Sequence, residues 1–312
     1  MSFDFSTVSA PFRMQPGLRR LAPGSVQLTP NAPGSAALNE KLAALQGHAP
    51  QALLAVAGFD PAPALRAVMR QAATEHPACF AWDGDAGLDA HALGWSVRGV
   101  EIHGAGPPQL GDCLRALPAP WRCAGLLSLA LTEDLAVIDG VTACIPWLAV
   151  CLPSRWAPED KVGRHFAEVH APVADNQLLL TAGEHLARLV CGQDRWERFV
   201  WSIGSDPRLQ QHPRLVPPTS WPAALDAEAL ASRATFRTEH QTFIPLPEVR
   251  QAVFTIRVES QPLTDAIDSP GRARQLHDAL ASMSESVLAY RSLTDARDRL
   301  LTWLASLSSR AA

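Results

Sequence analysis

The sequence predicts an α+β fold, with an antiparallel sheet in the middle of the chain and helices at both ends. Apolar residues recur at helical spacing after residue 36 and again from Ser269 onward, which is typical of helices that pack on a core. Between these regions, short apolar and β-branched runs are separated by turn signals, as in strands. Because neighbouring runs are joined by short turns, we expect them to pair as antiparallel hairpins.

Two N-terminal segments predict helices over 36–45 and 63–75. Their apolar faces are formed by Leu38, Leu42 and Leu45 in the first helix and by Leu65, Val68 and Met69 in the second. Lys41 is expected to face solvent from the first helix. The second helix is expected to end at His76, because the residue before a proline (here Pro77) avoids helical backbone angles.

The central region predicts strands over 125–139 and 141–152, joined by a turn at Asp139-Gly140. A glycine-rich stretch over 77–110 has short alternating pieces that predict another hairpin. Further strands are predicted over 199–203, 234–246 and 250–259, the last two joined through 247–249 as a hairpin. From 269 to the C-terminus the pattern is helical again.

Composition indicates one globular unit with an additional arm. Hydrophobic residues make up 47% of the chain and charged residues 19%, which is enough for a sizeable core and excludes a disordered chain. Residues 1–34 are rich in proline and glycine and are expected to form an extended arm laid over the rest. Residues 35–312 are then expected to form a single domain with helical additions.

Charge argues against two classes of partner. The net charge is −4 and the pI about 6.2, whereas non-specific nucleic-acid binding needs a basic surface. Binding to an anionic membrane surface would need a cluster of Lys and Arg, and no cluster longer than the Arg19-Arg20 pair occurs in the sequence. The longest uncharged apolar run, from Gly140 to Ser154, contains Pro146 and is shorter than the roughly 20 residues of a membrane span. We therefore expect neither nucleic acid nor membrane as a partner.

The cysteines and the first residues indicate a cytoplasmic protein. Six cysteines are scattered along the chain without a Cys-x-x-Cys pair, which is typical of free thiols in a reducing compartment. The segment from Met1 to Phe5 has no basic stretch followed by an apolar one, so no signal peptide is expected.

Common cofactor motifs are absent. Gly104-Ala105-Gly106 lacks the third glycine of a dinucleotide-binding loop, and no P-loop, His-Glu-x-x-His or Gly-x-Ser-x-Gly motif occurs. No group of cysteines has the spacing of an iron–sulfur centre. If the protein performs redox chemistry, its electrons must come from another component.

The segment 156–173 contains a candidate metal ligand. A helix is expected to begin at Pro158, to carry Val162, Phe166 and Val169 as an apolar stripe, and to end before Pro172, with His170 at the edge of the stripe. An imidazole there can bind a cofactor iron while its second nitrogen is held by a carbonyl group. The alternative is a histidine that caps the last carbonyls, and the spacing alone favours the cap.

Charged residues on the later strands offer a candidate pocket. The segment 237–242 alternates two polar faces, which is typical either of an exposed edge or of the wall of a polar pocket. Arg257 has apolar neighbours, so it must be paired or must face a cavity. Glu239 and Arg257 are a candidate ion pair across the hairpin. Glu133-Asp134 is expected at a turn or sheet end, because adjacent carboxylates point to opposite faces of a strand and at most one could be buried.

Together, several segments resemble one family. They are Gly17-Leu18-Arg19-Arg20-Leu21, Glu133-Asp134-Leu135, Leu152-Pro153-Ser154-Arg155-Trp156, Asp160-Lys161-Val162-Gly163, Val169-His170-Ala171-Pro172-Val173, Glu239-x-Gln241-Thr242 with Leu246-Pro247, and Phe254-Thr255-Ile256-Arg257. In this order they resemble the haem-dependent oxidative N-demethylase α-subunit family, over roughly residues 11 to 300.

The resemblance implies a fold, a cofactor and partners. The fold would be a PAS-like antiparallel sheet with added helices, and the cofactor haem b. The family's His-x-Pro-Val motif falls on His170, which becomes the expected iron ligand, and Lys161, Phe166 and Trp201 are expected to contact the cofactor. Trp201 is also the candidate aromatic wall for a small cation. The activity implied is oxidative removal of a methyl group from a small secondary amine, with O₂, release of formaldehyde, and electrons from flavin and iron–sulfur partner components.

The sequence departs from the family at three positions. Val200 replaces an asparagine, His240 replaces the second arginine of Arg-x-Glu-Arg-Gln-Thr, and Pro245 replaces an arginine before Leu246. These positions lie in segments expected to form the pocket, so the haem is better supported than the substrate.

Two classes of function follow from this sequence. In the first, the protein is an oxygenase-type enzyme that depends on haem. Arg237, Glu239 and Arg257 supply hydrogen bonds and protons, and His240 either tunes proton delivery or is a surface residue. In the second, the chain is a haem-binding PAS-like sensor or carrier without turnover, although no output module is recognisable. A related haem enzyme that uses peroxide or performs a redox-neutral rearrangement is a third, weaker alternative.

Overall fold

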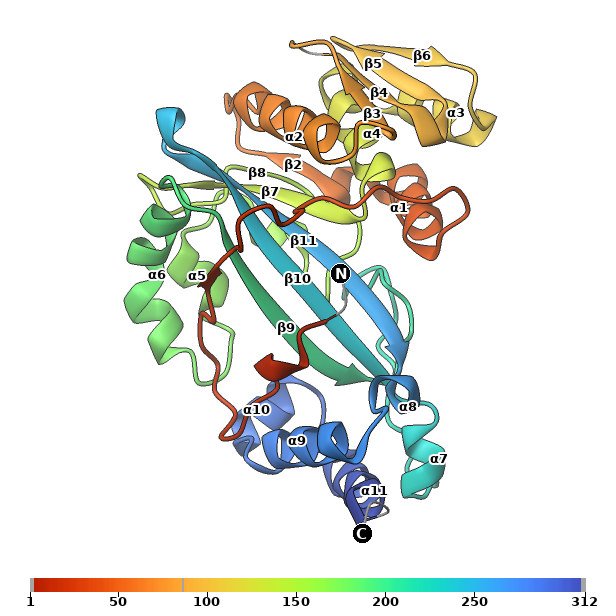
Figure 1. Cartoon of the computed structure of the whole chain (residues 1–312), viewed down its shortest axis with the longest axis vertical. Coiled ribbons are helices and arrows are strands. Elements are labelled where there is room, and N and C mark those ends of the chain that lie inside the picture. The colour runs from red at the N-terminus through yellow and green to blue at the C-terminus, as the bar shows by residue number, and fades with distance from the viewer. Residues whose placement is uncertain (1–2, 86, 310–312) are drawn as a thin grey trace.

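The protein combines helices with antiparallel sheets, which confirms the predicted α+β class (Figure 1). The computed structural model describes residues 3–85 and 87–309. The main sheet has seven strands in the order β1-β9-β10-β11-β7-β8-β2, and all its pairs are antiparallel. Its strands are β1 (Arg19–Arg20), β2 (Leu53–Ala55), β7 (Glu133–Asp139), β8 (Trp147–Ala149), β9 (Trp196–Gly204), β10 (Thr235–Leu246) and β11 (Gln251–Pro262).

The long ribbon of β9, β10 and β11 forms the centre of the molecule (Figure 1). The predicted hairpin of the last two strands is confirmed: Thr235 to Leu246 pair continuously with Pro262 to Gln251. On the other side of β10, Glu239 pairs with Val200 and Gln241 with Arg198. Because side chains alternate between the faces of a strand, this register decides which polar residues can share a cavity.

A second, four-stranded sheet lies beyond one end of the main sheet, as the yellow-orange strands of Figure 1 show. It is a meander of β3 (Phe80–Trp82), β4 (Gly87–Ala90), β5 (Trp95–Arg98) and β6 (Glu101–Gly104). The single hairpin predicted over 77–110 therefore underestimated this sheet, because strands of only three or four residues show little alternation.

The helices form three groups around the main sheet (Figure 1). Their bounds are α1 (Ala36–Ala52), α2 (Ala62–Glu75), α3 (Pro108–Ala116), α4 (Arg122–Ala130), α5 (Phe166–His170), α6 (Gln177–Val190), α7 (Ala227–Ala231), α8 (Leu263–Ala266), α9 (Pro270–Ala281), α10 (Glu285–Tyr290) and α11 (Arg297–Ser309). Helices α1 to α4 share the largest apolar core with the second sheet, and α7 to α11 share another core with the far end of the ribbon. Short α5 and longer α6 lie beside β9.

Helix α4 corrects the prediction of a strand that begins at 125. From Gly125 to Ala130 the segment is buried throughout and apolar except for Ser128, with Leu126, Leu127 and Leu129 fully buried, so no alternation marks an outer face. A short apolar run of this kind is compatible with a buried helix as well as with a buried strand. The predicted strand exists only from Glu133 onward, as β7.

Buried charges correct two further predictions. Lys41 is fully buried instead of facing solvent, and its Nζ lies 3.1 Å from Asp134 Oδ1 and donates to the backbone carbonyls of Leu131 and Glu133. Glu133 and Asp134 are both 1% exposed, because each face of β7 is covered. The Glu133 carboxylate accepts from the Thr29 amide, while burial raises its pKa.

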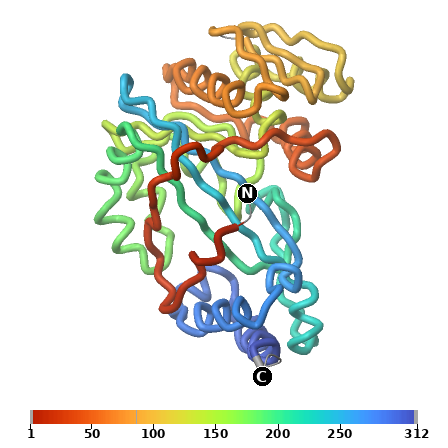
Figure 2. Tube along the Cα trace, in the orientation of Figure 1, coloured from red at the N-terminus to blue at the C-terminus, as the bar shows by residue number. Residues whose placement is uncertain are grey.

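The chain before α1 runs over the sheet from the C-terminal helices to α1 (red in Figures 1 and 2). Its regular elements are a short 3-10 turn at Phe5–Thr7 and β1, which pairs with β9 through Arg19 and Arg20. Phe3 and Phe5 pack on Phe236. The segment is therefore a packed wall of the protein as well as a connection.

The described residues contain no helix with the length and apolar character needed to cross a membrane. All six cysteines are free thiols, as predicted.

Candidate cofactor site

A cavity of about 400 Å³ lies between one face of the main sheet, the segment that carries α5 and α6, and the N-terminal segment. This volume is in the range of small-molecule and cofactor sites. Its apolar walls are formed by Met14, Pro16, Leu18, Ala136, Ile138, Ile145, Leu148, Val169, Leu179, Leu186, Ala187, Val190, Phe243, Phe254 and Ile256. The charged and polar residues gather on β9, β10 and the loops at one end.

The cavity changes from polar to apolar along β10. Arg237, Glu239, Gln241 and Phe243 all line it, since alternate residues of a strand share a face. Arg237 and Glu239 lie toward the C-terminal helices, and Phe243 lies against Phe254, with ring centroids 4.9 Å apart. A ligand in this cavity would thus meet charged side chains at one end and apolar side chains at the other.

His170 projects into the cavity from the end of α5. Its Nδ1 lies 2.8 Å from the Phe166 carbonyl oxygen, and its ring stacks on the Phe166 ring at 4.0 Å between centroids. Burial lowers the pKa of His170 to about 4, so the imidazole is neutral at physiological pH. A neutral ring that donates from Nδ1 to a carbonyl leaves the Nε2 lone pair available to a metal.

Several bonds fix the short helix that carries His170. His165 caps its N-terminus by accepting from the Ala167 amide, and Lys161 Nζ donates to the Val169 carbonyl at 2.7 Å. Asn176 Nδ2 donates to the His170 carbonyl at 3.0 Å. These bonds satisfy carbonyls and amides that a helix of this length leaves open.

The helix predicted to begin at Pro158 is wrong in its extent. A 3-10 turn over Pro158–Asp160 is followed by Gly163 at a φ of +73°, and helical geometry resumes only at Phe166. A positive φ breaks an α-helix and is tolerated by glycine. The break turns α5 so that both Phe166 and His170 reach the cavity.

Glu239 is held in place by neutral donors. Ser154 Oγ donates to Glu239 Oε1 and Gln241 Nε2 donates to Oε2 at 2.6 Å. The same Ser154 hydroxyl accepts from Arg237 Nε at 2.9 Å. No arginine or lysine forms an ion pair with Glu239 among the described residues, so its carboxylate can take a cationic group from a ligand.

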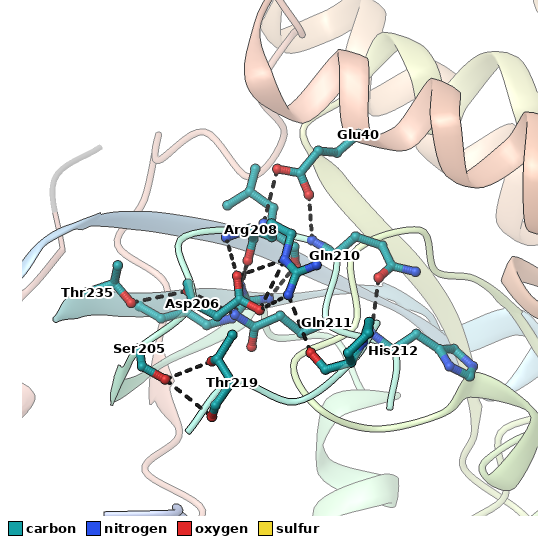
Figure 3. A network of polar contacts seen from close by, with 12 residues as sticks. Glu40, Ser205, Asp206, Arg208, Gln210, Gln211, His212, Thr219 and Thr235 are labelled. Atoms are coloured by element: carbon teal, nitrogen blue, oxygen red, sulfur yellow. Dashed lines mark hydrogen bonds and ion pairs between the residues drawn. The ribbon is translucent and has the colours of Figure 1, made fainter. Parts of the chain in front are cut away.

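The loop after β9 fixes the side chain of Arg237 at the wall of the cavity. Arg237 donates to the carbonyls of Arg208 and Leu209. Figure 3 shows how that loop is tied: Asp206 binds the Arg208 guanidinium, and the Glu40 carboxylate accepts from the Leu209 and Gln210 amides. Arg237 is therefore a positioning residue whose hydrogen bonds hold Ser154 and, through it, Glu239.

Two cavity cations were not anticipated from the sequence. Arg198 and Arg291 both line the cavity, and the Nε atom of each is buried without a hydrogen-bond partner in the part of the chain that the structure describes. Arg291 is otherwise engaged, because its Nη1 donates to the Trp201 carbonyl and its guanidinium lies over the rings of Phe12 and Trp201. The sequence could have shown that Arg198 shares a face of β9 with Trp196 and Val200, because alternate residues of a strand do so. It could not show that this face lines the cavity, since that depends on how β9 pairs with β10.

The structure does not bring all predicted site residues together. Lys161, Phe166, His170, Arg237 and Glu239 line the cavity, and Trp201 borders it. The Trp201 ring, however, belongs to the opposite face of β9 from Val200 and packs against Phe12 and Phe236 in the core of the C-terminal helices. His240 and Arg257 pair with each other in register on the opposite face of the sheet, where His240 stacks on Phe199 and bonds Glu197 at 2.8 Å. Arg257 pairs with Glu259, so the ion pair expected between Glu239 and Arg257 is wrong.

Among the described residues, no cluster of three or more His, Cys, Asp or Glu side chains could hold a metal ion. The fold and the cavity define a protein with a largely apolar internal site that carries one neutral imidazole and several cations. The chain belongs to the family described as haem-dependent oxidative N-demethylase, alpha subunit-like, whose model matches residues 37–301.

The cavity fits the haem that this family description implies. Apolar walls suit a porphyrin, the available Nε2 of His170 suits an axial iron ligand, and cations with unsatisfied N–H groups suit anionic edges of a cofactor. Phe166 and Leu179 would contact the ring system, while Lys161 holds the carbonyl end of α5.

Gly183 tests the support behind His170. A Cβ atom at this position would lie 2.6 Å from Cδ1 of Phe166, closer than real contacts allow. We expect Gly183→Ala to displace the Phe166 ring from His170 and to weaken haem binding roughly 10- to 100-fold, the usual cost of losing support behind a metal ligand. Haem titration measures this, and Ala182→Ser on the same helix is the control. Unchanged affinity in Gly183→Ala would contradict the role of Phe166.

Proposed function

We propose that this chain is a haem b-dependent enzyme that removes a methyl group oxidatively from a small secondary amine. The observation that carries the proposal is His170, a half-buried neutral imidazole with its Nδ1 on a carbonyl and its other nitrogen available in a cavity. Membership of the demethylase-like family supports the reaction type. The overall change is R–NH–CH₃ + O₂ + 2 e⁻ + 2 H⁺ → R–NH₂ + HCHO + H₂O.

Bound haem supplies the activation of O₂ for oxidation of the N-methyl carbon. Glu239 supplies the counter-charge for the substrate ammonium, because its carboxylate lines the cavity without an ion-pair partner in the described chain. The same carboxylate can accept the ammonium proton, which must leave before the nitrogen lone pair can assist oxidation of the adjacent carbon. Ser154 and Gln241 orient the carboxylate, and Arg237 holds Ser154.

The walls of the cavity exclude water from the reacting carbon. Val200 lies directly across from Glu239 in the strand register and lines the cavity with an aliphatic side chain. An apolar neighbour strengthens the attraction between a carboxylate and an ammonium group, since little water competes. The replacement of a polar residue by Val200 therefore favours a substrate with an apolar flank next to its nitrogen.

The electrons would come from a separate flavin and iron–sulfur component. The family description names an alpha subunit, which supports a partner chain, and the sequence carries no reductase motif. A cytoplasmic location and a PAS-like origin of the sheet are part of the same proposal.

An absorption spectrum together with product analysis tests the proposal. Purified protein reconstituted with haem should show a Soret band, and with O₂, an electron donor and N-methyl amines it should release formaldehyde. Omitting the donor or O₂ should abolish release. Absence of a Soret band would refute the haem assignment. A normal Soret band without formaldehyde from any secondary amine would favour a sensor or carrier instead.

A further inference from the structure

Among the described residues, Arg198 is the cation of the cavity whose side chain has no hydrogen-bond or ion-pair partner. Lys161 donates to the Val169 carbonyl, Arg237 to backbone carbonyls, Arg291 to the Trp201 carbonyl and Arg155 to the Arg291 carbonyl. In the described part of the chain, the Arg198 side chain makes no hydrogen bond or ion pair, and its Nε is buried. A guanidinium carries five N–H donors, and leaving the buried Nε–H without an acceptor next to apolar walls is costly.

The register places Arg198 between the two ends of the cavity. It pairs with Gln241, which makes it the diagonal neighbour of Glu239 on the same face of the sheet. Its charge acts on both Glu239 and His170. Among the described residues Arg198 and Glu239 nevertheless form no ion pair or hydrogen bond, and Glu239 accepts instead from Ser154 and Gln241.

The charges that line the cavity do not balance. The cations are Lys161, Arg155, Arg198, Arg237 and Arg291, and the anions are Asp206 and Glu239. Asp206 is already neutralised by Arg208, with Nη2 to Oδ2 at 2.6 Å. The excess positive charge favours an anionic group on the ligand. The guanidinium of Arg198 can donate hydrogen bonds to that group, because no described residue accepts from it.

We propose that Arg198 binds a carboxylate inside this cavity. A planar guanidinium and a carboxylate form two parallel N–H···O bonds, and a single free guanidinium matches a single carboxylate. Two sources carry this chemistry. One is a propionate of the haem, which rests on the proposed function; the other is a carboxylate on the substrate, as in an N-methyl amino acid whose ammonium group meets Glu239.

A stability measurement separates this role from a structural one. Replacing a residue that supports the fold lowers the melting temperature of the protein. Arg198→Met removes an unpaired charge from apolar surroundings, so the ligand-free protein should melt at the same or a higher temperature. A clear loss of stability in ligand-free Arg198→Met would contradict the assignment of Arg198 to a ligand.

The binding test has two arms, and Arg188→Met on the exposed face of α6 is the matched control. In the first, wild type and Arg198→Met are titrated with protohaem and with its dimethyl ester, followed by the Soret band. If Arg198 binds a propionate, the variant should bind protohaem at least about tenfold more weakly. The ester, which lacks free carboxylates, should bind both proteins equally.

In the second arm, the haem-loaded proteins are titrated with N-methylglycine and with dimethylamine, followed by the shift of the Soret band. If Arg198 binds a substrate carboxylate, Arg198→Met should lose at least about tenfold in affinity for N-methylglycine only. Arg198→Lys keeps the charge without the planar fork and should recover part of either loss. If neither arm distinguishes the variant from wild type, the proposal is wrong.

The two proposals can fail separately. If wild type shows no Soret band, the proposed function fails, and Arg198 is then tested by quenching of tryptophan fluorescence with N-methylglycine and acetate. Saturable binding in wild type that is lost in Arg198→Met would still support a carboxylate site. The absence of such binding, or its persistence in the variant, would overturn it.

Discussion

His170→Ala is expected to abolish axial ligation of haem by the protein and to lower haem affinity on the order of 100-fold or more. Loss of a residue that only supports a metal ligand costs about 10- to 100-fold, so loss of the ligand itself should cost at least as much. The fold should persist, because α5 is held by bonds from Lys161, His165 and Asn176 that do not use the imidazole. Spectra of the ferric and ferrous forms, with haem titration, provide the measurement.

Chemical rescue makes this test specific. The alanine variant leaves a cavity beside Phe166 that free imidazole can enter, so added imidazole should restore the wild-type spectrum. His185→Ala is the control, because His185 is exposed on the neighbouring helix α6. A ferrous spectrum of His170→Ala identical to that of wild type would show that another residue holds the iron.

Lys41→Met is expected to destabilise the protein by about 3–5 kcal/mol, the range found when one partner of a buried ion pair is removed. The change leaves the Asp134 carboxylate buried without its counter-ion, and the carbonyls of Leu131 and Glu133 lose their Nζ donor. These groups join α1 to the start of β7. Equilibrium unfolding in urea measures the free energy, provided that the transition has a single step.

The double variant Lys41→Met/Asp134→Asn distinguishes a broken ion pair from a cavity. Because no buried charge remains, it should be more stable than Lys41→Met, with a coupling energy above about 1 kcal/mol. The side-chain oxygen of the introduced asparagine can still accept from the backbone N–H of Leu152, as the Asp134 carboxylate does at 2.7 Å. Arg188→Met, which removes an exposed i,i+4 pair on α6, should cost less than about 1 kcal/mol. A loss below that value for Lys41→Met would mean that Lys41 is not buried as described.

Local patterns predicted the parts of the fold that depend on neighbours in the chain. The β10–β11 hairpin follows from two alternating runs around Pro247, and α2 follows from Leu65, Val68 and Met69, all buried as expected. His170 was singled out as a candidate because it lies next to an apolar stripe and before Pro172, but the spacing alone favoured a cap, and the family resemblance made it the expected ligand. Period-two alternation could also have separated Glu239 from His240, since adjacent strand residues face opposite sides.

Features that depend on distant segments could not be predicted in the same way. Lys41 looks like a solvent-facing residue until its partner Asp134 is brought to it from β7. Arg198 becomes conspicuous only when β10 is paired with β9 in a particular register, since the register decides that it shares a face with Glu239. The largely apolar α4, buried from Ala124 to Ala130, carries no alternation that tells a buried helix from a strand.

The N-terminal segment has a practical consequence for where a recombinant chain can begin. The match to the family begins at residue 37, whereas Met14, Pro16 and Leu18 form part of the cavity wall. A chain trimmed to the family boundaries would keep every strand of the main sheet except β1, but one side of the cavity would be open to water. The boundaries of the family model thus enclose the scaffold, while residues before them close one side of the cavity.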